Sequence, residues 1–134
     1  MIEIESLTRT YGEIRAVDGV SLTIDRGELM AIVGASGSGK TTLLRMINRM
    51  IDPTSGTLTV DGKDVTKVDP VKLRLGIGYV IQGHGLFPHR TVAENIAVVP
   101  RLLGWKTARI ADRVDELLEL VQLDPATFRD RRPH

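Results

Sequence analysis

Residues 34–41 read Gly-Ala-Ser-Gly-Ser-Gly-Lys-Thr, and this stretch matches the pattern G-x-x-x-x-G-K-[ST] at every fixed position. Immediately before it, residues 29–33 form a continuous apolar run, which predicts a strand covered on both faces. After it, the helical spacing of apolar residues predicts a helix from Lys40 that ends at Asp52-Pro53. The apolar positions of that helix are Leu43, Leu44, Ile47 and Ile51. The order strand, glycine-rich loop, helix is the context in which the pattern forms a phosphate-binding loop.

The residue types in this loop suit phosphate chemistry. Glycines let the backbone curl so that successive N–H groups point at phosphate oxygens, and the helix that begins near Lys40 adds its positive end. Lys40 is expected to bridge the β- and γ-phosphates, and the Thr41 hydroxyl to bind Mg²⁺. The predicted phosphate-binding residues are Gly34, Ala35, Ser36, Gly37, Ser38, Gly39, Lys40, Thr41 and Thr42. The alternative is an accidental Gly-Ser turn, which the strand and helix on either side disfavour.

Composition sets broad limits on the class of protein. The chain has 134 residues, of which 42% are hydrophobic, so one compact domain or part of one is expected. Lys and Arg number 18 against 17 Asp and Glu, a balance that does not predict a nucleic-acid partner. There is no cysteine, and the acidic start at residues 1–5 does not resemble a secretory signal, so a cytoplasmic location is expected. No apolar run approaches the roughly 20 residues of a membrane-spanning helix.

Further strands are predicted on both sides of the loop. Residues 2–7 and 20–24 alternate apolar with polar side chains, which predicts antiparallel strands with one wet face. Residues 57–60, followed by Asp61-Gly62, predict a short strand and a tight turn. Residues 77–81 predict one more strand.

The last third of the chain is predicted to be helical. Thr91-Val92-Ala93-Glu94 is a capping box that opens a helix, and Pro100 is expected to end it. A longer helix follows, with an apolar stripe at Ile110, Val114, Leu117, Leu118 and Val121. Asp124-Pro125 then begins one more short turn or helix. We therefore expect a boundary between residues 1–90 and residues 91–134.

A phosphate-binding loop alone indicates a nucleotide triphosphatase and leaves a transporter ATPase, a kinase and a GTPase open. The order of four segments decides among them: Tyr11-Gly12, residues 34–41, Gly78-Tyr79-Val80-Ile81-Gln82, and residues 86–95. This order resembles the ATP-binding subunits of ABC transporters over essentially the whole chain. The resemblance implies an α/β P-loop NTPase core with an antiparallel β subdomain in residues 1–90, and the beginning of a helical subdomain in residues 91–134.

The resemblance also implies roles for two residues outside the loop. Tyr11 matches the aromatic residue that stacks on adenine in this family, whereas the residues alone leave open a tyrosine packed on the sheet. Gln82 matches the family glutamine that reaches Mg²⁺ and the attacking water, whereas the residue alone reads as a solvated glutamine at a strand end. The implied catalytic residues are Lys40 and Gln82, and the implied metal ligands are Thr41 and Gln82.

The loop from Gln82 to His89 is where the family docks a transmembrane permease subunit. Its glycines and its apolar pair Leu86-Phe87 suit a docking hinge, although both side chains could instead anchor the loop to the core. His84 and His89 lack a third ligand at metal-binding spacing. The family further implies a homodimer of complete subunits that sandwiches two ATP, held at the inner face of the membrane by the permease.

A narrower resemblance concerns the transported solute. Residues 73–82, 85–89 and 97–105 look like importers of glycine betaine and related osmoprotectants. The sequence departs from them at Gly83-His84, where those importers more often have Gln and an aliphatic residue.

The family continues into an LSGGQ signature, an Asp-Glu at the end of a further strand and a switch histidine, whereas this sequence ends at Arg132-Pro133-His134. No carboxylate is therefore assigned as the metal ligand or base for hydrolysis. Because the further strand would lie beside residues 29–33, we expect an exposed apolar edge with poor solubility, self-association or partial order. Two other functions stay open: a non-hydrolysing nucleotide-binding or interaction fragment, and a soluble ABC ATPase of translation or repair.

Overall fold

The computed structural model describes residues 1–81, 83 and 85–133, and the chain divides into two compact units, Met1–Gly78 and Tyr79–His134. Each unit has its own hydrophobic core. The boundary expected at residue 90 rests on the change from strands to helices, which is a different criterion, and it stays a prediction.

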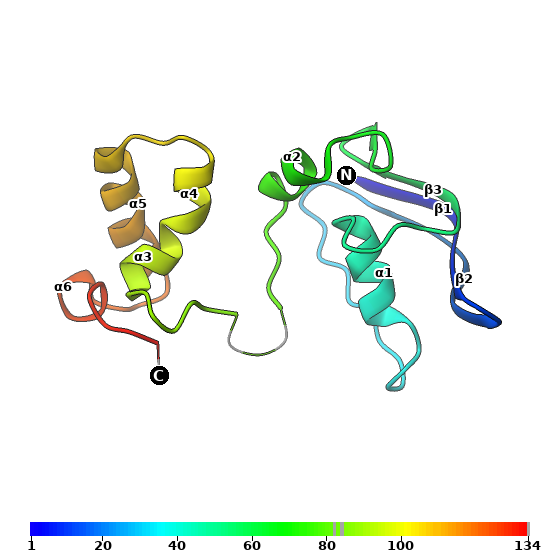
Figure 1. Ribbon diagram of the computed structural model, residues 1–134, viewed down its shortest axis with the longest axis horizontal. Coiled ribbons are helices and arrows are strands. Elements are labelled where there is room, and N and C mark those ends of the chain that lie inside the picture. The colour runs from blue at the N-terminus through cyan, green and yellow to red at the C-terminus, as the bar shows by residue number, and fades with distance from the viewer. Residues whose placement is uncertain (82, 84, 134) are drawn as a thin grey trace. The chain divides into compact units, whose positions relative to one another are not determined.

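The first unit is built on one antiparallel sheet with the strand order β2-β1-β3-β4 (Figure 1). Its strands are β1 (Ile2–Tyr11), β2 (Ile14–Ile24), β3 (Ser55–Val60) and β4 (Lys63–Asp64). The alternating segments at residues 2–7, 20–24 and 57–60 fall inside these strands, which confirms the predicted antiparallel sheet. The predicted tight turn is also present: Asp61 and Gly62 connect β3 to β4 with φ angles of 49° and 72°, as a two-residue hairpin turn requires.

Helix α1 (Lys40–Ile47) shares one core with the sheet. The buried members of this core are Ile4, Leu7, Val17, Leu43, Met46, Ile47, Leu58, Val65 and Leu73. The prediction that the helix continues to Ile51 is wrong, because Arg49 adopts a left-handed φ of 52° and the amides of Met50 and Ile51 donate to the carbonyl of Arg45. Leu44, one of the predicted apolar positions, is 44% exposed, whereas Asn48 is only 2% exposed.

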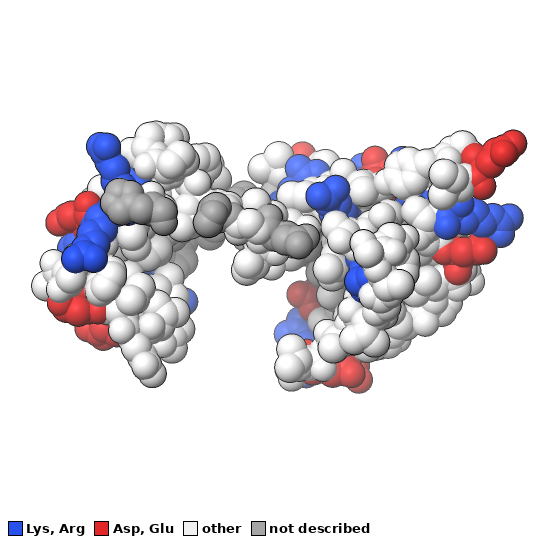
Figure 2. Space-filling view, turned by 90° about the horizontal axis from the view of Figure 1, so that it is seen from below, with Lys and Arg blue, Asp and Glu red and all other residues white. Residues whose placement is uncertain are grey.

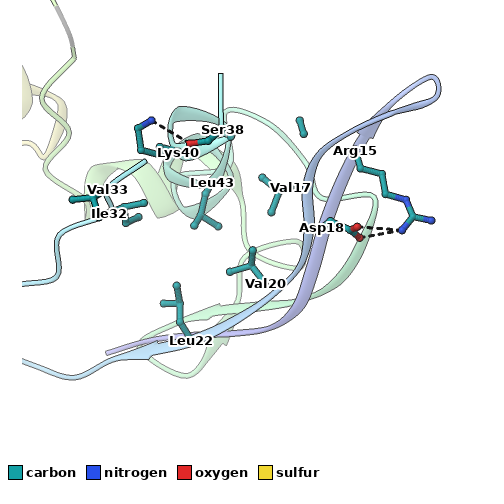
Figure 3. Close-up of a pocket in the computed structure, with 12 residues that line it drawn as sticks. Arg15, Val17, Asp18, Val20, Leu22, Ile32, Val33, Ser38, Lys40 and Leu43 are labelled. Carbon is teal, nitrogen blue, oxygen red and sulfur yellow. Dashed lines mark hydrogen bonds and ion pairs between the residues drawn. The ribbon is translucent and has the colours of Figure 1, made fainter. Parts of the chain in front are cut away.

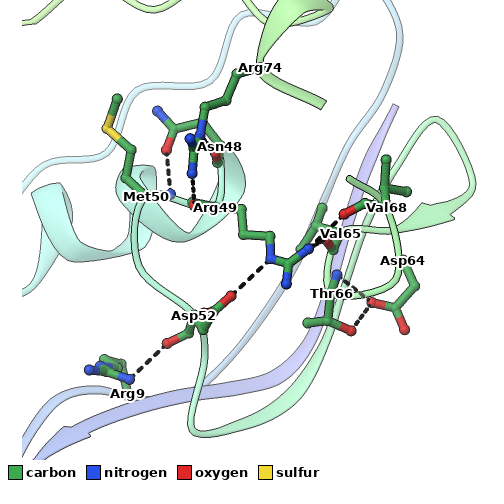
Figure 4. A network of polar contacts seen from close by, with 10 residues as sticks. All are labelled: Arg9, Asn48, Arg49, Met50, Asp52, Asp64, Val65, Thr66, Val68 and Arg74. Carbon is green, nitrogen blue, oxygen red and sulfur yellow. Dashed lines mark hydrogen bonds and ion pairs between the residues drawn. The ribbon is translucent and has the colours of Figure 1, made fainter. Parts of the chain in front are cut away.

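Two arginines connect the end of α1 to the segment that follows β4 (Figure 4). Arg74 donates from Nε to the carbonyl of Asn48 at 3.1 Å and from Nη2 to the carbonyl of Arg49 at 2.6 Å. In return, Nη1 of Arg49 donates to the carbonyls of Val65 at 3.2 Å and Val68 at 2.6 Å. The bonds from Arg74 reach carbonyls at the end of α1, where a helix leaves carbonyl groups without intrahelical partners.

Arg74 lies on α2 (Pro70–Leu75), a helix that we did not predict. Its signal is in the sequence: Asp69 accepts from the amide of Lys72 at 2.9 Å and Pro70 occupies the first helical position. The same two residue types begin α6 (Pro125–Phe128), where the Asp124-Pro125 prediction is confirmed.

Two predicted strands are absent from the described residues. Residues 29–33 and residues 77–81 belong to no helix or strand, and Leu29 and Val33 are 97% and 88% exposed. The reason is that a buried parallel strand needs a neighbouring strand on each side, and the sheet of the described residues consists of β1 to β4. Ile32 in the first segment and Ile77 in the second are partly buried against the first core.

The second unit consists of α3 (Val92–Ile96), α4 (Val98–Leu102), α5 (Thr107–Leu120) and α6 (Pro125–Phe128) (Figure 1). The predicted capping box is present, since the amide of Glu94 donates to Oγ1 of Thr91 and the amide of Thr91 donates to Oε2 of Glu94. Pro100 does not end this helix; it lies in the first turn of α4, where a proline has no hydrogen bond to lose. The buried core is Ala97, Ile110, Val114 and Leu118.

Acidic and basic side chains lie next to each other on the face of the first unit that Figure 2 shows. The exposed ion pairs of this unit include Arg26 with Asp61 at 2.9 Å and Arg15 with Asp18 at 3.2 Å. Throughout the described part of the chain, every helix is too short or too polar to span a bilayer.

Candidate functional site

The glycine-rich loop ends directly against strand β2. Gly39 is the N-cap of α1 and has a left-handed φ of 88°, a conformation that glycine adopts without strain. A Cβ at this position would overlap the main-chain carbonyl oxygen of Ala16 in β2. The close approach of loop and strand therefore requires glycine at residue 39.

Lys40 folds back over the loop that precedes it. Its Nζ donates to the carbonyl oxygens of Gly34 at 2.8 Å and Ala35 at 2.6 Å, and it lies 3.2 Å from Oγ of Ser38. Three oxygens of the loop thus surround one ammonium group, which concentrates a positive charge at the centre of the loop.

A cavity of about 160 Å³ lies between the loop and β2. It is lined by Ala16, Gly37, Ser38, Gly39, Lys40, Thr41 and Thr42. Lys40, Thr41 and Thr42, the first residues of α1, belong to this wall, and the first N–H groups of a helix have no intrahelical partners. The cavity therefore combines an ammonium group, hydroxyl groups and a helix N-terminus, which is the chemistry that binds an anion.

A larger cavity of about 430 Å³ shares Ala16, Ser38, Gly39 and Lys40 with the first one (Figure 3). Val17, Val20 and Leu22 of β2 form one side of it, and Ile32, Val33 and Leu43 contribute from the loop side and α1. Arg15 and Asp18, which pair with each other, also line it. A largely apolar cavity thus lies beside the smaller cavity.

The sequence interpretation missed Ala16 and Val17 as parts of this site. Neither residue belongs to the loop pattern, and no signal in the sequence places them opposite Gly39. Their position follows from the fold of β2, which brings the Ala16 carbonyl to Gly39.

Tyr11 lies at the end of β1, where 45% of it is exposed. One face of its ring is covered by the guanidinium group of Arg9, whose Cζ is 4.5 Å from the ring centroid. Tyr11 is not among the described residues that line either cavity. Gln82 and His84 lie outside the described residues, so the structure gives no position for the predicted glutamine.

The apolar pair of the predicted docking loop is exposed. Leu86 and Phe87 are 52% and 45% exposed, and neither belongs to the core of the second unit. This arrangement favours a docking role over the alternative in which the pair anchors the loop to the core.

Carboxylate and histidine side chains do not gather near the loop. Within residues 1–81, 83 and 85–133, no group of three His, Asp or Glu side chains could hold a metal ion by itself.

Comparisons with known proteins place the site in context. A family model described as ABC transporter matches residues 17–134. The carnitine transport ATP-binding protein OpuCA of Listeria monocytogenes is 49% identical over 135 residues, which cover 100% of this chain and 34% of that protein. The osmoprotectant import ATP-binding protein OsmV of Salmonella typhimurium is 47% identical over 138 residues, which cover 99% of this chain and 36% of that protein.

Solved structures agree with the sequence comparisons. The ATP-binding cassette MJ0796, in a dimeric structure with ADP and Pi, superposes with a TM-score of 0.84 at 31% identity, covering 99% of this chain and 62% of that one. The fold is accordingly that of an ABC ATPase core. The chain spans about a third of the length of the first curated relatives, 34% in the case of OpuCA.

Proposed function

Because this chain belongs to the ABC transporter family, we propose that it binds Mg-ATP through residues 34–42 as the ATP-binding subunit of an importer. The observation that carries the proposal is the position of Lys40. Its ammonium group sits within the glycine-rich loop and lines an open cavity beside the first turn of α1.

The residues present fit a polyphosphate. The Lys40 ammonium can exchange its loop acceptors for phosphate oxygens, and the amides at the start of α1 can donate to the same anion. The Thr41 hydroxyl suits Mg²⁺, which favours oxygen ligands and retains several waters. When bound, Mg²⁺ neutralises charge on the phosphates.

Tyr11 and Gln82 take the remaining roles by family resemblance. We assign the Tyr11 ring to adenine stacking, which uses the face that Arg9 leaves free and requires the ring to approach the loop. Gln82 is assigned to the Mg²⁺ ion and the attacking water, together with Lys40 as a catalytic residue.

The proposed importer moves glycine betaine or a related osmoprotectant. This class of solute is supported by the names of the relatives, which refer to carnitine transport and osmoprotectant import. A transmembrane permease docks on the loop from Gln82 to His89, and two complete subunits form the ATP-bound dimer. The subunit then lies on the cytoplasmic face of the membrane.

A second candidate is nucleotide binding without hydrolysis. The lining of the smaller cavity, as far as the structure describes it, consists of uncharged residues and Lys40. A general base for the attacking water is therefore not supplied by those residues. In that case the chain binds ATP or the permease without hydrolysing ATP.

Calorimetric titration of Mg-ATP into the chain, with phosphate release followed in the same sample, separates these functions. Binding that Lys40→Ala abolishes would support the phosphate-binding assignment, and phosphate release would favour the ATPase over the non-hydrolysing candidate. Thr8→Ala serves as a control, because the Thr8 hydroxyl contacts only the amide of Gly19 and the carbonyl of Ser6 among the described residues, and Thr8 lines neither cavity, so binding should be unchanged. Failure of the unmodified chain to bind Mg-ATP would overturn the proposal.

A further inference from the structure

The side chain of Asn95, in α3, holds the loop that precedes this helix. Its Nδ2 donates to the carbonyls of Thr91 at 2.9 Å, Phe87 at 3.1 Å and Arg90 at 3.4 Å. Its Oδ1 accepts from the amide of Phe87 at 2.8 Å. One carboxamide therefore satisfies main-chain groups at both ends of the loop.

Asn95 is itself held on a fixed helix. The capping box of Thr91 and Glu94 closes the first turn of α3. The amides of Val92 and Ala93 donate to the carbonyls of Arg131 at 2.8 Å and Arg129 at 2.9 Å. Because α3 is anchored at its start, the carboxamide restrains the loop and not the reverse.

The restrained loop presents an apolar surface with a positive edge. Leu86 and Phe87 are exposed, and the guanidinium Cζ of Arg90 lies 4.9 Å from the Phe87 ring centroid. The ring of His89 meets Phe87 edge-on at 5.9 Å. The side chains of Leu86 and Phe87 are held at the surface, although neither belongs to the core of the second unit.

We propose that Asn95 is a positioning residue that presets residues 86–90 for the permease. The partner that fits this surface is an amphipathic helix with an apolar residue for Leu86 and Phe87 and an acidic residue for Arg90. The inference rests on the proposed function, since it assumes that this loop docks the permease. Its new content is that Asn95, which does not touch the partner, determines the affinity by keeping the loop in its binding conformation.

The test compares Asn95→Ala with Thr91→Ala. Thr91→Ala breaks the capping box but keeps the Thr91 carbonyl that Asn95 binds, so it weakens α3 without releasing the loop. The chain binds nanodiscs that contain the permease subunits of the Listeria carnitine transporter, and hydrogen exchange reports the protection of the Phe87 amide. If Asn95→Ala lowers the binding-competent fraction of the loop to about a tenth, binding weakens about tenfold.

The expected result is faster exchange of the Phe87 amide and weaker permease binding in Asn95→Ala, with neither change in Thr91→Ala. Fast exchange with unchanged binding in Asn95→Ala would overturn the positioning role. Equal weakening of binding in both variants would also overturn it, because general loss of helix stability would then explain the effect.

A second pair of variants tests the docking surface itself. Phe87→Ser should abolish binding, whereas Leu120→Ser, at a 74% exposed leucine of the same unit, should not. Unchanged binding by Phe87→Ser, or no binding by the unmodified chain, would overturn the docking proposal together with the role of Asn95. If Phe87→Ser alone abolishes binding and Asn95→Ala does not, the docking proposal survives and the inference fails.

Discussion

The main-chain carbonyl oxygen of Ala16 lies where a side chain of residue 39 would have to be. Gly39 thus meets two demands at the same position: a left-handed φ of 88° and a contact with β2 that leaves no room for Cβ. These demands join the phosphate-binding loop to the antiparallel sheet, because α1 begins at the point of contact.

Gly39→Ala should destabilise the first unit more than Gly37→Ala. Both positions have left-handed φ angles, 88° and 81°, but a Cβ on Gly37 meets nothing within 4 Å. Gly37→Ala should therefore lower the free energy of unfolding by about 1 kcal/mol for backbone strain alone. Gly39→Ala also forces the glycine-rich loop away from β2. Urea denaturation should therefore show a loss in the free energy of unfolding at least twice as large as that of Gly37→Ala. Equal losses would mean that the contact with Ala16 is easily relaxed.

Removing the Arg74 guanidinium should destabilise the end of α1. Arg74→Ala releases the carbonyls of Asn48 and Arg49, and the left-handed φ of 52° at Arg49 then lacks its support. We expect a loss of about 2 kcal/mol in the free energy of unfolding, typical for bonds to a charged donor. Arg15→Ala is the control, because its pair with Asp18 is 66% and 59% exposed, and it should cost at most about 0.5 kcal/mol. Similar losses in the two variants would contradict the prediction.

Local patterns predicted the parts of the structure that depend on local interactions. The alternation in β1, β2 and β3, the Asp61-Gly62 turn and the Thr91 capping box each involve residues close in sequence, and each is confirmed. The loop at residues 34–41 also lies directly before a helix, as its pattern predicts.

Features that depend on distant residues were not predictable in the same way. Residues 29–33 have the composition of a buried strand, but a strand forms only when a neighbour supplies hydrogen bonds. The end of α1 depends on Arg74, which is 25 residues from the Arg49 carbonyl that it binds. The contact of Ala16 with Gly39 and the hydrogen bonds from Asn95 to its preceding loop likewise have no sequence pattern of their own.

Thr66→Val should raise the pKa of Asp64. Hydrogen bonds from the Thr66 hydroxyl and amide, followed by the contact with Lys67, lower the pKa of Asp64 from its ordinary value of 3.8 to about 2. Valine keeps the amide but removes the hydroxyl, which is the largest cause. The carboxyl carbon of Asp64, followed by NMR during a pH titration, should move towards the ordinary pKa, and Lys67→Ala should shift it less. A larger shift in Lys67→Ala would reverse this assignment of causes.

The same carboxylate gives a stability change with a defined sign. A pKa that is lower in the folded chain means that ionised Asp64 stabilises the fold above pH 4, and that this contribution disappears as the pH falls towards 2. Asp64→Asn should therefore be less stable than the parent chain at pH 7, and the difference should shrink between pH 4 and pH 2. Thermal unfolding at a series of pH values measures it, and a difference that grows on acidification would contradict the argument.

Leu29→Lys should reduce self-association without unfolding the first unit. Leu29 is 97% exposed in an apolar segment that belongs to no strand of the described sheet, so this segment can pair with the same segment of another copy. A charge at this position disfavours such pairing, and an exposed site loses no packing.

Sedimentation velocity over a range of concentrations should show less oligomer in Leu29→Lys, whereas Leu120→Lys, at a site 74% exposed in the second unit, should associate like the parent. Leu7→Lys is a control for unfolding, because Leu7 is 0% exposed and a lysine at this position should unfold the first unit. A parent chain that is monomeric at every concentration would contradict the prediction, because the exposed segment would then not cause self-association.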